Sequence, residues 1–384
     1  MIRFDSVTKT YPDGTVAVNR LAFEAPSGQI TVLVGPSGCG KTTSLRMINR
    51  MIEPTSGTIW LDDQDTARVP THELRRGIGY VIQHAGLFPH RTVADNVGTV
   101  LRLTGWSRKR ARGRAVDLLE RVGLPASFAD RYPAQLSGGQ QQRVGVARAL
   151  AADPPVMLMD EPFSAVDPVV REQLQDEFLR LQAELGKTIV FVTHDIDEAI
   201  KLGDQVAVLR VGGELAQLAP PAELLASPAD PFVAGFVGRD RGYRGLGFAA
   251  AGSLPTRPEP TVRLGVELSH ARAVADGDWV LAVDDRNAPL GWLALDGLPD
   301  EALRRTLTTD LLNLGGTLAN PRSSLREALD SALSSPSGRG VVVDEVGALA
   351  GTVTVGQMLE LIEGRTAGRR RPAQQSGATL GAQA

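Results

Sequence analysis

The sequence predicts an α/β fold with a largely parallel β-sheet for residues 1–238 and a smaller α+β region behind it. Short runs rich in β-forming residues alternate with helical stretches in the first region, which is typical of helices packed on a parallel sheet. Residues 85–150 contain no such run, and this predicts a helical subdomain inserted into the sheet domain. The predicted strands are ITVLVG, IGYVIQ, VMLMDE, TIVFVTH and QVAVLRV.

A repeat with an offset of sixty residues predicts the α+β region, at 261–364. Val283-Asp284-Asp285 is followed by Gly291, and Val343-Asp344-Glu345 is followed by Gly351. Each unit reads as an apolar strand, an acidic turn, a second strand that begins at the glycine, and then a helix. The two helices are predicted at PDEALRRTL and GQMLELIEG.

The segments around the repeat are also informative. Ser324 and Glu327 have the spacing of a capping box, which predicts the start of a further helix before the second unit. Residues 239–260 are rich in Gly, Pro and Arg, so we expect a linker there. Residues 365–384 lack apolar periodicity and are expected to form a disordered tail.

Composition excludes several classes of protein. Hydrophobic residues make up 42% and charged residues 22% of the 384 residues, which is ordinary for a globular protein. No apolar run is long enough to predict a transmembrane helix, and the N-terminus lacks the apolar segment of a secretory signal. The single cysteine fits a reducing compartment, and the net charge of −3 gives no general attraction to nucleic acid. We therefore expect a cytosolic protein that does not bind nucleic acid.

The strongest motif is a phosphate-binding loop. GPSGCGKT matches the pattern G-x-x-x-x-G-K-[ST] between a predicted strand and a predicted helix. Its glycines let backbone N–H groups surround phosphate oxygens, while Lys41 is expected to reach the β- and γ-phosphates and Thr42 to ligate Mg²⁺. The alternative is a glycine-rich turn at a helix start. The expected nucleotide-binding residues here are Gly35, Pro36, Ser37, Gly38, Cys39, Gly40, Lys41, Thr42 and Thr43.

Cys39 lies inside this loop. A bulky adduct on its thiol would block the entry of a nucleotide, so alkylation is predicted to inhibit nucleotide hydrolysis and bound nucleotide to slow the alkylation. The alternative is a buried and unreactive thiol.

A predicted strand that ends in two acids complements the loop. Asp160 follows the apolar run VMLM and is expected at the strand tip, where it can hold Mg²⁺ through water. Glu161, one residue further, is placed to polarise an attacking water. A strand followed by a solvated acidic turn is the alternative, and the presence of a phosphate loop makes it less convincing.

A second stretch, LSGGQQQR at 136–143, also has the character of an anion site. Ser137, Gly138 and Gly139 precede a helical sequence, and the N-terminal N–H groups of a helix attract an anion. The chain already has a phosphate loop of its own, so this second site suits an anion that arrives from another molecule.

With its motifs in this order, the chain over residues 1–238 resembles the ATPase subunit of an ATP-binding cassette (ABC) transporter. The resemblance implies ATP hydrolysis with Mg²⁺, and it identifies LSGGQ, which ends in Gln140, as the family signature. The implied roles are adenine stacking for Tyr11, sensing of Mg²⁺ and the γ-phosphate for Gln83, and a switch histidine at His194. The resemblance also implies a D-loop at 164–167, which ends in Asp167 and has Val166 in place of the usual leucine. The alternatives are that Tyr11 covers a hydrophobic patch and that His194 is an ordinary strand-edge residue.

In this family two subunits pack head to tail, and the signature of one subunit closes the ATP site of the other. The chain has one phosphate loop and one signature. The resemblance therefore implies a homodimer.

Three longer stretches resemble the ATPases of importers for glycine betaine, carnitine, choline and proline: RMINRMIEPTSG, IGYVIQHAGLFPHRTVADN and VTHDIDEAIKLGDQVAVLRVGGE. This resemblance implies a membrane permease as a direct partner and an extracytoplasmic substrate-binding protein as an indirect one. It also implies a peripheral position on the cytoplasmic face of the cell membrane. An importer for another solute and a non-transport regulatory ABC ATPase are the alternatives.

Members of this group often carry paired cystathionine-β-synthase (CBS) modules, which the repeat resembles. Modules that bind nucleotides usually have a threonine and, three residues later, an acid. Here the second unit has Thr354 and Gln357, and the first unit has Ala294 and Gly297. Adenine-nucleotide binding therefore competes with dimerisation and ionic-strength sensing as the expected role of the repeat.

The segment that follows Gln83 is expected to bind the permease. Leu87, Phe88 and Pro89 are apolar residues in a predicted loop, and an apolar loop on a globular protein indicates a partner surface. Packing of Phe88 into the core of the helical subdomain is the alternative.

Overall fold

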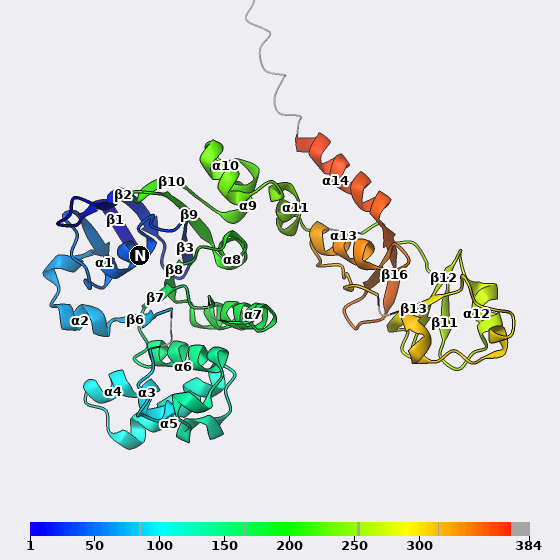
Figure 1. The fold of residues 1–384 in the computed structure, drawn as a ribbon, viewed down its shortest axis with the longest axis horizontal. Coiled ribbons are helices and arrows are strands. Elements are labelled where there is room, and N and C mark those ends of the chain that lie inside the picture. Colours follow the sequence, from blue (N-terminus) through cyan, green and yellow to red (C-terminus); the bar gives the residue numbers. More distant parts are fainter. Residues whose placement is uncertain (84–85, 165, 252–253, 314, 370–384) are drawn as a thin grey trace, which may run out of the picture. The chain divides into compact units, whose positions relative to one another are not determined.

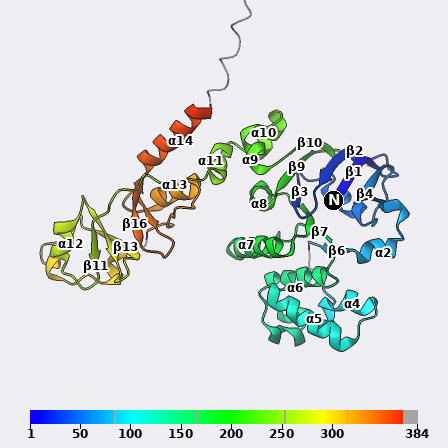
Figure 2. The same ribbon diagram turned by 180° about the vertical axis from the view of Figure 1, so that it is seen from behind.

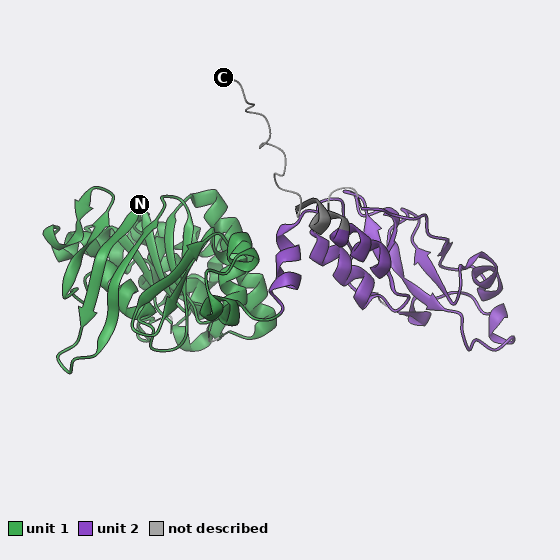
Figure 3. Ribbon diagram, turned by 90° about the horizontal axis from the view of Figure 1, so that it is seen from above, with its two compact units in different colours: residues 1–239 green, residues 240–384 purple. Residues whose placement is uncertain are grey.

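The structure is a computed structural model that describes residues 1–83, 86–164, 166–251, 254–313 and 315–369. The chain forms two compact units, Met1–Arg239 and Asp240–Ala384, which Figure 3 draws in different colours. Each unit has hydrophobic cores of its own. No helix in the described ranges combines the length and the apolar character that a membrane span requires.

A six-stranded sheet forms the centre of the first unit (Figure 1). Its strand order is β10-β9-β3-β8-β7-β6, and all neighbours are parallel except β10 and β9. The three middle strands are buried along their whole length, as expected for a sheet covered on both faces. These findings confirm the predicted α/β fold. The strands are β3 (Ile30–Val34), β6 (Ile78–Val81), β7 (Val156–Asp160), β8 (Thr188–Val192), β9 (Gln205–Arg210) and β10 (Glu214–Ala219).

A second, antiparallel sheet of this unit was not predicted. Its strand order is β2-β1-β4-β5. The pairing of β1 with β2 shifts register three times, so the alternation of buried and exposed residues that marks a strand is interrupted. The strands are β1 (Ile2–Thr10), β2 (Val16–Ala25), β4 (Ser56–Leu61) and β5 (Gln64–Asp65).

The described residues between β6 and β7 form the predicted helical subdomain. Its helices group together below the sheet in Figures 1 and 2. They are α3 (Val93–Val97), α4 (Thr99–Leu103), α5 (Arg108–Arg121) and α6 (Gly138–Leu150), with 3₁₀ turns η2 (Ala126–Asp130) and η3 (Pro133–Gln135). The other helical segments of the unit are α1 (Lys41–Ile48), η1 (Thr66–Arg68), α2 (Thr71–Arg76), α7 (Pro168–Leu185), α8 (Ile196–Leu202), α9 (Pro221–Ala226) and α10 (Pro231–Val237).

The second unit contains the predicted repeat as two similar hairpins. In each hairpin the turn aspartate, Asp284 or Asp344, donates its backbone N–H across the turn and accepts two backbone N–H groups with its carboxylate. The capping box of Ser324 and Glu327 also forms and starts α13. The elements are α11 (Arg241–Gly245), η4 (Leu246–Phe248), β11 (Thr261–Arg263), α12 (Leu268–Val274), β12 (Trp279–Val283), β13 (Pro289–Ala294), η5 (Ala302–Arg304), η6 (Thr309–Leu311), β14 (Leu312–Asn313), α13 (Leu325–Ser334), β15 (Arg339–Val343), β16 (Leu349–Thr354) and α14 (Val355–Arg369).

The predicted linker at 239–260 is wrong for much of its length. Residues Arg241–Gly245 form a helix, and Leu254 is buried in the core of the second unit, where Tyr243 and Leu246 pack against it. The prediction failed because the segment is rich in glycine and arginine, and its few apolar residues form no pattern that indicates these tertiary contacts.

Two further boundaries differ from the predictions. PDEALRRTL forms only the turn η5, because Leu307 donates its N–H to Val266 and Leu268 donates to Arg305, which holds this chain segment in an extended pairing. The predicted disordered tail starts too early, since α14 continues to Arg369. Residues 370–384 lie outside the described residues.

Candidate functional site

Four loops that carry predicted site residues follow neighbouring parallel strands. β3, β8, β7 and β6 lie side by side in this order, so their carboxyl ends meet at one edge of the sheet. β3 leads into the phosphate loop and β6 into Gln83, while Asp160 ends β7 and His194 follows β8. This edge is the candidate nucleotide site.

The phosphate loop has a backbone that requires glycine. Gly40 caps α1 with a φ of 86°, and a Cβ at this position would lie 2.2 Å from the carbonyl oxygen of Ala17. A Cβ on Gly35 would lie 2.4 Å from the carbonyl oxygen of Leu209. The loop is thus held between two other chain segments, while Ser37 and Gly38 at its tip are exposed. The N–H groups at the start of α1 are available to phosphate oxygens.

Lys41 is buried and folds onto its own loop. Its Nζ donates to the carbonyl oxygens of Gly35 at 2.7 Å and Pro36 at 3.0 Å. The ammonium group thus lies close to where the loop would hold phosphates. When a nucleotide binds, it would exchange these carbonyl acceptors for phosphate oxygens. Pro36 and Thr43 are half-buried at either end of the loop.

The expected reactivity of Cys39 is not supported by the structure. The side chain is fully buried, and burial raises the pKa of the thiol although Lys41 Nζ lies 3.7 Å from Sγ. The thiolate is the reactive form, so both effects slow alkylation.

We therefore expect iodoacetamide to leave Cys39 largely unmodified in the native protein under conditions that modify it fully in urea. Mass spectrometry of the two samples measures the difference, and ATP hydrolysis of the native sample should persist. Rapid, complete modification of the native protein with loss of hydrolysis would instead support the original expectation.

Thr42 and Asp160 form the part of the site that suits a cation. Thr42 Oγ1 donates to Asp160 Oδ1 at 2.9 Å, which joins the start of α1 to the end of β7. Asp160 is only 6% exposed, and burial raises the pKa of its carboxyl while the hydrogen bond from Thr42 and the charge of Arg46 act in the opposite direction. A buried carboxylate beside a hydroxyl is stabilised by a divalent cation, so these two residues fit Mg²⁺. Arg46 was missed in the sequence, although its position one helical turn after Thr42 places it on the same side of α1.

Glu161 brings three of the predicted residues together. Its Oε2 lies 3.0 Å from His194 Nδ1 and accepts a hydrogen bond from Gln83 Nε2 at 3.3 Å. The backbone of Glu161 has a φ of 46°, which is strained for this residue type. Its backbone N–H donates to Val192 and its carbonyl accepts the hydroxyl of Ser164, and these two bonds hold the strained turn. Ser164, the first residue of the expected D-loop, thus has a positioning contact with Glu161 that its place in the motif did not predict.

The signature segment starts α6 in the helical subdomain. Ser137 Oγ accepts the N–H of Gln140 at 3.3 Å, and Gln140 Oε1 accepts the N–H of Ser137 at 3.0 Å. This capping box fixes the helix start while Ser137 and Gly138 are exposed to solvent. Gly139 and Gln140 are half-buried. An exposed helix N-terminus of this length can accept an anion from outside the chain.

Asp167 lies at the start of α7, and Tyr11 follows the end of β1. Asp167 caps α7 by accepting the N–H of Val169 at 3.0 Å, and Ala165 of the predicted D-loop lies outside the described residues. Tyr11 is half-buried at a turn after β1, with the ammonium group of Lys9 5.4 Å from its ring centroid. Lys9 was not selected in the sequence, where nothing marks a lysine two residues before a tyrosine.

A nucleotide loop on a sheet domain, with a serine-capped helix start on an inserted helical subdomain, is the arrangement of the ATP-binding cassette ATPases. Comparison with known proteins agrees with this class. The family described as ABC transporter matches residues 18–164.

Among curated relatives, the carnitine transport ATP-binding protein OpuCA of Listeria monocytogenes is 41% identical over 371 residues, which cover 94% of this chain and 92% of the relative. The osmoprotectant import ATP-binding protein OsmV of Salmonella typhimurium is 47% identical over 302 residues, which cover 76% of this chain and 79% of the relative. Among solved structures, a dimeric ATP-binding cassette in a post-hydrolysis state with ADP and Pi matches with a TM-score of 0.53 and 36% identity, covering 58% of this chain and 99% of the other. The chain belongs to the ABC transporter family and is one of its ATP-binding subunits.

Proposed function

We propose that the chain hydrolyses ATP to power an importer for osmoprotectants such as glycine betaine, carnitine, choline or proline. The observation that carries the proposal is the similarity, over 94% and 76% of this chain, to the two curated relatives named above, whose names describe carnitine transport and osmoprotectant import. The proposed partners are a membrane permease and, through it, an extracytoplasmic substrate-binding protein. The proposed position is peripheral, on the cytoplasmic face of the cell membrane, and no nucleic acid is involved.

The proposed chemistry assigns a role to each site residue. Lys41 and the N–H groups of the phosphate loop bind the phosphates, and Tyr11 stacks on adenine. Glu161 polarises the attacking water, and its contacts with His194 and Gln83 hold the carboxylate in place. Mg²⁺, held by Thr42, Gln83 and Asp160, would neutralise negative charge on the phosphates.

The active form is proposed to be a head-to-tail homodimer. The support is the exposed helix start at the signature and the dimeric state of the solved cassette. In this dimer Ser137, Gly138, Gly139 and Gln140 of one subunit contact the γ-phosphate bound to the other, and Asp167 lies at the same interface.

Uptake of labelled glycine betaine by the chain reconstituted with its permease tests the proposed function. Uptake that requires ATP and stops with Lys41→Ala supports it. ATP hydrolysis without uptake of any of the four solutes would favour an importer for another solute, and hydrolysis by a chain that binds no permease would favour a regulatory ATPase.

The loop after Gln83 supports the proposed contact with the permease. Phe88 is 39% exposed, whereas Leu87 packs against the hydrophobic core. The buried Asn96 holds the backbone of Phe88 by accepting its N–H at 2.7 Å and donating to its carbonyl at 3.1 Å. The guanidinium of Arg91 lies 4.6 Å from the ring centroid. Phe88 is thus fixed by its backbone and partly exposed, which supports a partner surface over a core position.

Phe88→Ala is expected to reduce uptake at least about tenfold, because loss of a buried aromatic anchor costs about 2 kcal/mol or more at an interface. ATP hydrolysis by the free subunit should not change. Leu103→Ala, which removes another exposed apolar side chain of the same subdomain, is the matched control. Equal uptake by both variants would remove Phe88 from the interface.

A regulatory role is proposed for the second unit. Gln357 Oε1 accepts the hydroxyl of Thr354 at 3.0 Å, and its Nε2 donates to the carbonyl of Pro255 at 2.8 Å. The position that carries an acid in nucleotide-binding modules is therefore already engaged within the unit. This geometry favours ionic-strength sensing or dimerisation over an adenine nucleotide.

A chain that ends at Arg239 should retain basal ATP hydrolysis, because every site residue and the buried end of α10 belong to the first unit. Its transport should no longer respond to salt. Uptake across a range of salt and adenine-nucleotide concentrations measures this, with a chain that ends at Arg369 as the control. The same responses in the truncated and complete chains would contradict a regulatory role.

A further inference from the structure

The signature segment at 136–140 lies against α7, the helix that follows the D-loop in the same chain and is called the D-loop helix below. A Cβ built on Gly139 would lie 3.4 Å from Val170 and 3.7 Å from Leu174, both of which belong to α7. Val166 of the D-loop is the next neighbour, at 3.8 Å. The start of α6 therefore faces the first two turns of α7 with room for one further carbon at contact distance.

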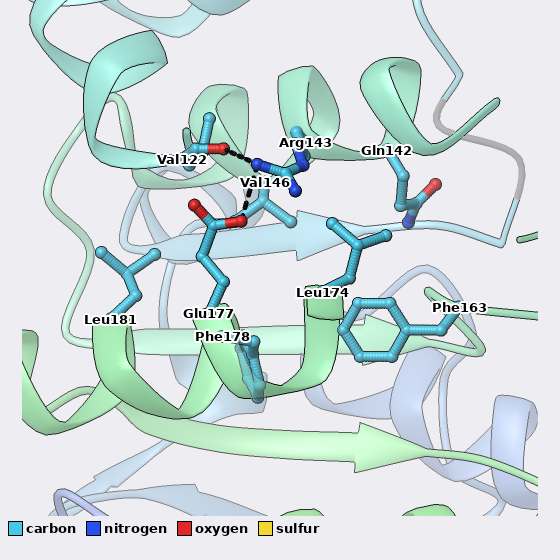
Figure 4. Close-up of a pocket in the computed structure, with 9 residues that line it drawn as sticks. All are labelled: Val122, Gln142, Arg143, Val146, Phe163, Leu174, Glu177, Phe178 and Leu181. Atoms are coloured by element: carbon cyan, nitrogen blue, oxygen red, sulfur yellow. Dashed lines mark hydrogen bonds and ion pairs between the residues drawn. The ribbon is translucent and has the colours of Figure 1, made fainter. Parts of the chain in front are cut away.

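An ion pair joins the same two helices further along (Figure 4). Arg143 of α6 places Nη1 2.6 Å from Oε2 of Glu177 on α7, and the two side chains are 22% and 21% exposed. This pair differs from Arg180 and Glu184, which lie 3.6 Å apart along α7 alone and are largely exposed. Only the first pair crosses between these two helices.

The guanidinium of Arg143 also holds the end of α5. Nη1 donates to the carbonyl oxygens of Val122 at 3.0 Å and Gly123 at 3.4 Å, where a cation is favoured by the helix dipole. Gly123 has a φ of 70°, and a Cβ there would lie 2.3 Å from both Arg143 Nη1 and Glu177 Oε1. A glycine at this helix end therefore leaves the space that the ion pair occupies.

The contact beside the ion pair is apolar and incompletely filled. Phe163, two residues after Glu161, and Phe178 lie 6.1 Å apart by ring centroids and line a cavity of about 30 Å³ next to Arg143 and Glu177. Apolar contacts are non-directional and allow two helices to slide, whereas a charge-assisted hydrogen bond fixes distance and direction. The ion pair is therefore the contact that sets the register of α6 on α7.

We propose that Arg143 and Glu177 are positioning residues that hold the signature helix against the D-loop helix. Ser137 and Asp167 then reach the nucleotide of the partner subunit as one rigid unit. This inference rests on the head-to-tail dimer proposed above, and it makes the effect of Arg143 directional: the residue acts on the ATP bound to the other subunit.

A heterodimer with one functional phosphate loop tests this direction. One subunit carries Lys41→Ala, so that only the other subunit binds ATP, and two affinity tags isolate the mixed dimer. Arg143→Met, which keeps the apolar stem and removes the charge, is placed either in the Lys41→Ala subunit or in the ATP-binding subunit. ATP hydrolysis should fall about tenfold or more in the first placement only, because a small displacement of a closed site is costly.

Two controls separate the sources of failure. Ser137→Arg in the same two placements reports whether the signature works in the partner's site, and Arg180→Met reports the loss of an ion pair that does not join the helices. Both mixed dimers contain the same two substitutions but on different chains, so thermal unfolding and gel filtration of each dimer first establish that the two are equally stable. Equal hydrolysis in the two Arg143→Met placements, with a clear difference for Ser137→Arg, would overturn the positioning role alone. No difference for Ser137→Arg would overturn the head-to-tail dimer and with it this inference.

Discussion

Glu161→Gln is expected to reduce ATP hydrolysis at least about a hundredfold, the range found when a general base is removed. Glutamine keeps the shape of the side chain but cannot accept a proton from the attacking water. The carboxylate that changes is the group that meets both His194 and Gln83, so the substitution acts at the centre of the constellation. ATP binding should persist, because the phosphate loop is untouched.

Single-turnover hydrolysis and equilibrium binding of a fluorescent ATP analogue measure the two effects separately. Gel filtration in the presence of ATP should show the variant as a stable dimer. Glu172→Gln, an exposed glutamate on α7, is the control for loss of a carboxylate. Hydrolysis near the normal rate would show that another group activates the water.

The positions of the site residues were predictable because strand ends and motifs fix them together. Asp160 ends a buried strand after four apolar residues, and parallel neighbours must bring Gln83 and His194 to the same edge. The contacts among them were not predictable. The φ of 46° at Glu161 depends on the bond that its N–H donates to Val192 of β8, and no local pattern records a bond between segments so far apart.

The failures share a physical cause, which is tertiary contact that overrides local pattern. PDEALRRTL has helical spacing, yet a backbone pairing with the segment around Val266 extends it. The stretch around Tyr243 looks like a linker by composition, although it packs against the core of the second unit. Cys39 belongs to a loop that binds ligand, but its side chain turns inward and is buried. In each case the sequence shows the segment but not its neighbour.

Gly40→Ala is expected to weaken ATP binding at least about a hundredfold, or roughly 2.7 kcal/mol. Two costs add up. A φ of 86° is unfavourable for alanine by about 1–3 kcal/mol, and the new Cβ would lie 2.2 Å from the carbonyl oxygen of Ala17, which adds about 1–3 kcal/mol of overpacking. The neighbouring atom belongs to the backbone of β2, so it cannot move aside as a side chain would. The loop must deform, and its N–H groups then no longer converge on the phosphates.

Gly186→Ala is the matched control for this substitution. Gly186 follows α7 with a φ of 58°, and a Cβ there would meet no atom within 4 Å. Both variants carry the cost of a left-handed alanine, so the difference in their thermal stability isolates the contact with Ala17, and only Gly40→Ala, which lies in the phosphate loop, should lose ATP affinity. Isothermal titration with ATP measures affinity, and thermal unfolding confirms that both variants are folded. Equal ATP affinity in the two variants would mean that the loop can shift away from β2 without losing its phosphate-binding shape.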